Sequence, residues 1–266
     1  MLSADQIREF HDTGYLLGAR VLCDNQIESL RIETLRVIDQ REAKDIPQPV
    51  LCHNMGRPDA PIWQIVNIWM ASEPFKQLVT HPTICEEVAQ LHDNPRCLRI
   101  WHDQIQFKPA GKGGVNMWHQ DSPYWGILTP KDAQVTAWIA LDDVDESNGC
   151  MSMVPHSHHW GNAIQFLHTL KTFDDMRAVK EFQGNELRVI PRPVKKGHVH
   201  YHHSLTWHGS HANTSDRPRR AIALHYMTDQ TLYVGKGEHV MKKFVEVADG
   251  EPLKGDAFPV VWGDCP

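Results

Sequence analysis

The chain has 266 residues, of which 41% are hydrophobic and 23% charged, and its formal net charge is −6. This composition is that of an ordinary globular protein, and an acidic balance without a basic stripe excludes a typical nucleic-acid-binding protein. The length suits one large domain, so we expect residues 1–266 to form a single domain.

The cysteines and the hydrophobic segments of the sequence indicate the cellular compartment of the protein. The six cysteines are scattered and form no C-x-x-C pair, so we expect no disulfide framework. The N-terminus shows no signal-peptide pattern. The sequence contains no run of 18 apolar residues, so no membrane span is predicted. These features predict a cytoplasmic protein with a small-molecule substrate, no nucleic-acid partner and no membrane contact. They predict no particular oligomeric state.

The N-terminal part of the chain, about residues 1–95, is predicted to be mainly helical. Ser3 can cap a short helix, and a short apolar strand follows at 15–17. Asp24 can cap a second helix, and Pro82 suits the first position of a third. The helix residues spaced for burial are Ile7, Phe10, Ile27, Leu30, Leu35, Ile38, Ile84, Val88 and Leu91.

Beyond residue 95 the hydrophobic pattern changes to the alternation that is typical of strands. The predicted strands are 98–101, 104–108, 135–141, 151–154, 199–201 and 220–226. An irregular, partly helical insertion is predicted at 162–190. Helices followed by many short strands indicate an α+β, mainly β fold. We expect a jelly-roll core over about residues 96–266 with the N-terminal helices packed outside it.

A possible metal site begins at Trp118-His119-Gln120-Asp121. His119 and Asp121 lie two positions apart, so at the end of a strand both side chains point to the same side. Because the chain has 18 His and 20 Asp, about one such pair is expected by chance, and the pair alone is not diagnostic. A distant histidine would complete the 2-His-1-carboxylate set that binds Fe(II) and leaves coordination positions open. The segment 198–211 supplies six candidates.

Among these candidates His208 is preferred because the residues after it fit a cosubstrate. Ser210 offers a hydroxyl, and Arg219 offers a rigid fork of donors that matches the distal carboxylate of 2-oxoglutarate. On a strand, Arg219, Ala221 and Ala223 would share one face, where the small residues leave room for a ligand.

Alternatives remain at these positions. The chosen arginine could instead form a surface ion pair, for example with Asp216, and Arg217 and Arg220 are rival anchors. His202 and His203 are expected to brace the site or to face solvent.

Several motifs carry a resemblance that covers nearly the whole chain. They are Lys108-Pro109-Ala110-Gly111, Trp118-His119-Gln120-Asp121, Trp138-Ile139-Ala140-Leu141-Asp142-Asp143, Asn148-Gly149-Cys150 and His208-Gly209-Ser210. In this order they resemble the motifs of the phytanoyl-CoA dioxygenase family. The resemblance implies a double-stranded β-helix (jelly-roll, cupin-like) fold that uses Fe(II), 2-oxoglutarate and O₂.

The resemblance also implies site residues. The iron ligands and catalytic residues would be His119, Asp121 and His208. Arg219 and Ser210 would bind 2-oxoglutarate, with Trp138 beside it. Gln104 matches a family position that touches the cosubstrate, although an ordinary strand amide is an equal alternative.

The chain departs from the family pattern around the cosubstrate. A family Gly-Asp is Gly197-His198 here, and a family Pro-Gly-Ser-His is Pro155-His156-Ser157-His158. A family lysine involved with 2-oxoglutarate is replaced near Gln64. These departures concern the surroundings of the cosubstrate and the substrate, and they leave the metal ligands intact.

These observations predict a non-haem Fe(II), 2-oxoglutarate-dependent dioxygenase. It would hydroxylate an unactivated C–H bond of a small natural product or sugar-like molecule and release succinate and CO₂. A free acyl-CoA is not favoured, because no basic cluster for its phosphates stands out. The presence of Asp121 disfavours halogenation, since halogenating relatives replace this carboxylate. The alternative function is a cupin-like metal-binding isomerase or a non-oxidative binding protein.

Overall fold

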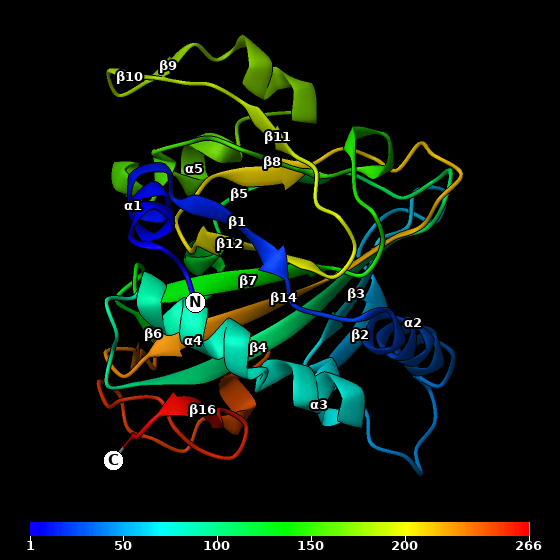
Figure 1. The fold of residues 1–266 in the computed structure, drawn as a ribbon, viewed down its shortest axis with the longest axis vertical. Coiled ribbons are helices and arrows are strands. Elements are labelled where there is room, and N and C mark those ends of the chain that lie inside the picture. Colours follow the sequence, from blue (N-terminus) through cyan, green and yellow to red (C-terminus); the bar gives the residue numbers. More distant parts are fainter. Residues whose placement is uncertain (266) are drawn as a thin grey trace.

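The computed structural model describes residues 1–265 as two packed antiparallel β-sheets with helices outside the larger one (Figure 1). The larger sheet contains, in order, β1 (Tyr15–Arg20), β12 (His198–His203), β7 (Gln134–Ala140), β14 (Arg219–Thr228), β4 (Cys97–Lys108), β3 (Trp63–Val66) and β2 (Leu51–Asn54), with β16 (Val260–Gly263) also paired to β4. The smaller sheet contains β11 (Ile190–Arg192), β8 (Met151–Met153), β13 (His208–Ser210) and β5 (Asn116–His119). The expected jelly-roll architecture is confirmed.

The helices cover the outer face of the larger sheet. They are α1 (Ala4–Thr13), α2 (Asp24–Asp39), α3 (Glu73–Val79) and α4 (Pro82–Leu91), while the short α5 (Ile164–Leu167) belongs to the insertion. Ser3 and Gln6 form a capping box at α1, and Pro82 begins α4, as the sequence predicts. Buried apolar side chains of all four helices join one core with the sheet. Leu35 was expected in that core but is 46% exposed.

Alternation along the central strands explains why both faces of the larger sheet are buried. On β7, Val135, Ala137 and Ile139 point to the helical core, whereas Trp138 and Ala140 point to the smaller sheet. Strand β14 repeats the pattern, with Ile222, Leu224 and Tyr226 on the helical side and Ala221 and Ala223 on the inner side. Polar side chains on the inner face therefore meet the smaller sheet, and this is where the candidate site lies.

Some elements differ from the sequence predictions. Strands 98–101 and 104–108 form one continuous strand, β4, and the N-terminal part contributes β1, β2 and β3 to the larger sheet. Helix α3 and strand β16 were not predicted. The insertion contains α5, a 3-10 helix and the hairpin of β9 (Glu181–Phe182) and β10 (Asn185–Glu186). Another small pair joins β6 (Leu128–Thr129) to β15 (Leu232–Tyr233).

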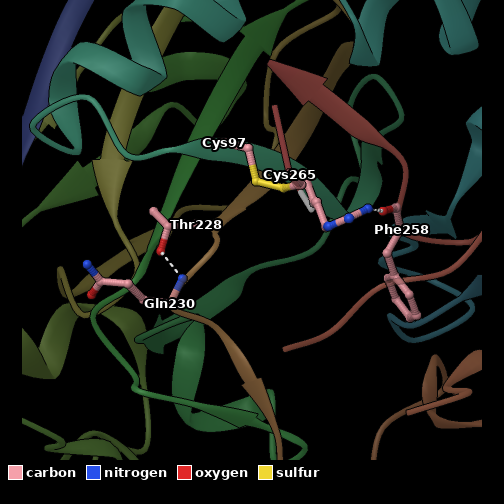
Figure 2. Close-up of a disulfide and its surroundings, with 6 residues drawn as sticks. Cys97, Thr228, Gln230, Phe258 and Cys265 are labelled. Carbon is pink, nitrogen blue, oxygen red and sulfur yellow. Dashed lines mark hydrogen bonds between the residues drawn. A yellow bond between two sulfur atoms is a disulfide. The ribbon is translucent and has the colours of Figure 1, made fainter. Parts of the chain in front are cut away.

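The expectation of no disulfide is corrected at one place. Cys97, the first residue of β4, is bonded to Cys265 beside β16 (Figure 2). The two cysteines are 168 positions apart, so their spacing resembles no motif, and only the pairing of β16 with β4 brings them together. Within residues 1–265, none of the helices has the length and apolar character needed to cross a membrane.

Candidate metal centre and its cavities

Three predicted ligands meet between the paired strands of the smaller sheet. His119 ends β5, Asp121 follows two positions later, and His208 begins β13 directly opposite His119. The Nε2 atoms of His119 and His208 lie 3.8 and 3.6 Å from Oδ1 of Asp121. In the part of the chain that the structure describes, these residues form the only group of three whose potential ligand atoms lie within 4.8 Å of one another.

Backbone hydrogen bonds orient both imidazoles. Nδ1 of His119 lies 2.8 Å from the carbonyl oxygen of Met117, and Nδ1 of His208 lies 2.9 Å from that of Thr206. Each Nδ1 therefore carries the hydrogen, and each Nε2 is left as a free donor atom for a metal. Burial lowers the pKa of both histidines to about 4, so they are neutral at physiological pH, as metal ligands must be.

The carboxylate of Asp121 is held from the opposite side by the larger sheet. Its Oδ2 accepts a hydrogen bond from Oγ1 of Thr136 at 2.9 Å and contacts Nε2 of His202 at 3.2 Å. Because the Thr136 hydrogen goes to Asp121, Nδ1–H of His225 donates to Oγ1 of Thr136, at 2.8 Å. Burial alone would raise the pKa of Asp121, but His208, His202 and His225 together hold it well below its usual value. The free Oδ1 thus faces the two ligand histidines, and this donor set fits Fe(II).

A narrow cavity extends from the ligands toward the predicted cosubstrate residues. Arg219, Ser210, Trp138 and Gln104 all line it, together with the three metal-ligand candidates. Arg219 is 2% exposed, its Nη2 donates to Oγ of Ser210 at 3.1 Å, and its guanidinium carbon lies 5.7 Å from the Trp138 ring. Burial lowers the pKa of Arg219 to about 10, which leaves it charged at neutral pH. The structure therefore gathers all seven predicted residues around one space.

The rival arginines are occupied elsewhere. Arg217 pairs with Asp145 at 2.7 Å, and Arg220 pairs with Asp142 at 2.8 Å. Among the described residues, Arg219 forms no ion pair with a carboxylate. Nε2 of Gln64 donates a hydrogen bond to Oε1 of Gln104 at 2.9 Å. Gln64, near which the family lysine is replaced, therefore contacts a residue that lines the narrow cavity.

A larger cavity of about 660 Å³ adjoins the narrow one and shares His119 and Asp121 with it. Its lining contains Asp121 but no lysine, arginine or glutamate. Half of the large hydrophobic side chains that are exposed on this protein line it; they are Met55, Val115, Met117, Tyr124 and Val240. A partly apolar space of this size, without basic side chains, suits a drug-sized molecule that carries no negative charge.

Three further histidines form one wall of the larger cavity. Nδ1 of His102 contacts the carbonyl oxygen of Asp103 and Nδ1 of His225 donates to Thr136, so each ring has a bare Nε2. Nε2 of His102 is buried and has no protein partner. His239 has the opposite tautomer, because its Nδ1 accepts from the backbone N–H of Met241. Burial lowers the pKa of His225 and His239 to about 4 and holds that of His102 well below its usual value, so the wall offers two neutral acceptors and one neutral donor.

Reasoning from the sequence missed the residues that hold the ligands. Thr136, His202 and His225 lie on strands β7, β12 and β14, on the face that turns toward the smaller sheet. For Thr136 and His225 the available signal was a polar residue among apolar ones in the middle of a strand, whereas His202 lies among other histidines of β12 and had no such signal. His203, the neighbour of His202, points away and lies 5.2 Å from the ring of His158.

A jelly roll that presents two histidines and a carboxylate beside a buried arginine has the architecture of Fe(II)- and 2-oxoglutarate-dependent oxygenases. The family model described as phytanoyl-CoA dioxygenase (PhyH) matches residues 10–221. The chain belongs to this family. It is an oxidoreductase whose cofactor is Fe(II) and whose cosubstrate is 2-oxoglutarate.

Individual relatives agree with this assignment. Phytanoyl-CoA dioxygenase domain-containing protein 1 of Danio rerio is 32% identical over 166 residues, which cover 60% of this chain and 55% of that protein. Thus the match spans about half the length of this relative. The peroxisomal phytanoyl-CoA dioxygenase of Bos taurus is 23% identical over 93% of this chain and 76% of its own length.

Solved structures share the whole fold. The 2-oxoglutarate-dependent carbocyclase SnoK from nogalamycin biosynthesis superimposes with a TM-score of 0.77 at 27% identity, covering 98% of this chain and 97% of its own. The epimerase SnoN from the same biosynthesis has a TM-score of 0.72 at 21% identity, covering 97% and 98%. At that lower identity the likeness to SnoN shows the fold alone.

Proposed function

We propose that the protein hydroxylates an unactivated C–H bond of an uncharged, ring-bearing small molecule, such as a natural product or sugar derivative, and releases succinate and CO₂. We further propose that the chain does this as a single oxygenase domain. The observation that carries the proposal is the position of His119, Asp121 and His208, which line a narrow cavity with Arg219 and Ser210, while His119 and Asp121 also line a larger cavity without basic side chains.

In this proposal His119, Asp121 and His208 hold the iron. When bound, iron with 2-oxoglutarate and O₂ supplies the oxidant that removes hydrogen from a C–H bond. The protein fixes the ligands before the metal arrives, since backbone carbonyls orient both imidazoles and Thr136 with His202 orients the carboxylate. The side chains serve to bind, orient and exclude water.

Arg219 and Ser210 are proposed to hold the distal carboxylate of 2-oxoglutarate, with Trp138 and Gln104 lining its path. Supporting this role, Arg219 is buried and has no carboxylate partner among the described residues, whereas Arg217 and Arg220 each form an ion pair with one. A buried guanidinium without an anion is destabilising, and a bidentate carboxylate satisfies it.

The substrate class follows from the larger cavity. Because its lining has no lysine or arginine, it offers no counter-charge for the phosphates of an acyl-CoA. The bare Nε2 atoms of His102 and His225 accept hydrogen bonds, and Nε2–H of His239 donates one. A substrate with hydroxyl and carbonyl groups on an apolar ring system satisfies this wall and the exposed hydrophobic mouth.

Oxidative ring closure is a second candidate. It is favoured by the 27% identity to the carbocyclase over 98% of this chain. Both reactions start by removing hydrogen from carbon, and they differ in the product. Hydroxylation makes the substrate one oxygen atom heavier, whereas ring closure makes it two hydrogen atoms lighter.

The test is a substrate screen that measures succinate formation above the substrate-free background and records product mass. The panel contains a hydroxylated polycyclic ketone, a glycoside and an acyl-CoA, with His208→Ala as the inactive control. We expect stimulation by the uncharged ring compounds. Stimulation by the acyl-CoA alone would overturn the substrate class. Fe(II) binding with no succinate and no visible band on adding 2-oxoglutarate would instead favour a cupin-like isomerase or binding protein.

A further inference from the structure

Lys108 opens the Lys-Pro-Ala-Gly motif, and the functions assigned so far do not use it. It is the last residue of β4, and the register pairs it with Arg219 on β14. The two side chains are 0% and 2% exposed, so two cationic groups are buried side by side. Such a pair is costly unless an anion compensates it.

Within residues 1–265, neither cation has a carboxylate partner. Nζ of Lys108 donates to the backbone oxygens of Ser210 and His211, at 3.3 and 2.5 Å. Arg219 donates to the backbone oxygens of Gly149 and Gln106, at 3.2 and 3.3 Å. Burial lowers the pKa of Lys108 well below its usual value, and the charge of Arg219 lowers it further. The protonated form of Lys108 is therefore disfavoured where no anion lies beside it, and a bound anion would favour it.

Both cations converge on one hydroxyl. Oγ of Ser210 accepts from Nζ of Lys108 at 2.7 Å and from Nη2 of Arg219 at 3.1 Å. These two bonds occupy the lone pairs of the oxygen, so its own hydrogen has to be donated. The nearest protein acceptor is Oδ1 of Asn116, at 3.3 Å, which also lines the narrow cavity. This contact is long, so a carboxylate bound in that cavity could replace Asn116 as the acceptor of the hydroxyl hydrogen.

The loop after Lys108 seals the lysine from solvent. A Cβ at Gly113 would collide with Cβ of Lys108, so glycine allows the loop to lie directly on the lysine stem. Nδ2 of Asn213 donates to the carbonyl oxygen of Lys108 at 3.2 Å and fixes the same junction. Lys112, in the same loop, is exposed. Charge inside this seal acts with little screening by water.

We propose that Lys108 is a positioning residue of the cosubstrate anchor, which supplies a second buried positive charge and turns the Ser210 hydroxyl toward the distal carboxylate of 2-oxoglutarate. Lys108 does not line the cavity itself and acts through Ser210. The inference rests on the proposed function, since it requires Arg219 and Ser210 to hold that carboxylate.

The experiment compares two ligands on the Fe(II)-loaded protein without oxygen. 2-Oxoglutarate and 2-oxopentanoate both carry the keto acid end, but the second has a methyl group in place of the distal carboxylate. Binding is followed by the visible band and by tryptophan fluorescence. Lys108→Met removes the charge and the donors at similar volume, and Lys112→Met is the matched control. Melting and Fe(II) uptake confirm that each variant is folded; Lys108→Gln replaces Lys108→Met if the latter does not fold.

We expect Lys108→Met to raise the Kd for 2-oxoglutarate about tenfold or more, as for a lost charge-assisted hydrogen bond, with the Kd for 2-oxopentanoate unchanged. Lys112→Met should bind both like wild type. In a Ser210→Ala background the effect of Lys108→Met should shrink, because the two residues act together. If Lys108→Met weakens the binding of both ligands equally, or of neither, the inference is wrong. The proposed function still stands in that case, provided that the wild-type protein binds 2-oxoglutarate. If wild type itself does not bind 2-oxoglutarate, the proposed function fails, and the inference with it.

Discussion

Replacing Thr136 with valine tests how the larger sheet holds the carboxylate ligand. Thr136 lies on β7 opposite His225 of β14, is fully buried, and donates its only hydroxyl hydrogen to Oδ2 of Asp121. Valine has nearly the same shape and leaves that oxygen without this donor. It also leaves Nδ1–H of His225 without its acceptor.

The expected loss of Fe(II) affinity depends on which contacts Asp121 keeps in the variant. A hydrogen bond to a charged group contributes about 1.5–3 kcal/mol, and residues that orient metal ligands typically change metal affinity by about 10–100-fold. His202 still contacts Oδ2 at 3.2 Å in the variant, so the carboxylate keeps one of its two partners. We therefore expect the smaller effect, an Fe(II) affinity about tenfold lower, which corresponds to about 1.4 kcal/mol.

The assay is anaerobic competition for Fe(II) with a chromophoric chelator, accompanied by thermal melting. Thr136→Ser keeps the hydroxyl and should restore most of the affinity. Thr34→Val is the matched control, because Thr34 is equally buried and donates only to Leu30 within α2. That control should alter melting but not Fe(II) affinity. A folded Thr136→Val protein that binds Fe(II) like wild type would refute the reasoning.

Three further predictions concern the anchor, the distal ligand and acid stability. Arg219→Ala should raise the KM for 2-oxoglutarate roughly 30-fold or more at saturating iron, since a desolvated charged pair contributes on the order of 2–5 kcal/mol; Arg217→Ala, measured alongside, should not. His208→Ala should abolish Fe(II) binding in the chelator assay while His203→Ala retains it, and the reverse would show that the wrong histidine was chosen. Burial lowers the pKa of His92 to about 4 and that of His203 to about 3, so below about pH 6.5 the unfolded chain binds protons that the folded one does not. Urea unfolding should therefore show full stability above pH 6.5 and a fall toward pH 4, by up to about 1.4 kcal/mol per pKa unit of each group; a flat profile would contradict this.

The metal-ligand candidates could be selected from the sequence because local geometry places two of them. His119 and Asp121 are two positions apart, and any extended strand end directs both to one side. His208 needed the residues after it, since six histidines compete in that segment. Arg219 was distinguished from Arg217 and Arg220 only by the small residues on its strand face, and the structure shows its neighbours paired with carboxylates.

The remaining features depend on which strands become neighbours, and no local pattern encodes that. Thr136, His202 and His225 reach Asp121 only because β12, β7 and β14 are adjacent in the larger sheet. The short β3 forms because β4 extends far enough to pair with it, and β2 pairs in turn with β3. Strand β16 is held at the far end of β4 beside the disulfide. Hydrophobic periodicity and capping residues predict that a helix or strand forms, whereas the packing of the whole chain decides which strands pair with one another.

The two cavities differ in the kind of interaction they offer, and this separation has a consequence for specificity. In the narrow cavity, Arg219 lies in the lining and Lys108 contacts it through Ser210, and neither has a carboxylate partner among residues 1–265. The lining of the larger cavity has no lysine or arginine, and neutral imidazoles are among its polar groups. Away from the metal ligands, a carboxylate in the larger cavity would be desolvated without a basic side chain to compensate it, which is unfavourable. If Arg219 anchors 2-oxoglutarate as proposed, charge favours the cosubstrate in the narrow cavity, whereas hydrogen bonding and shape would select the substrate in the larger one.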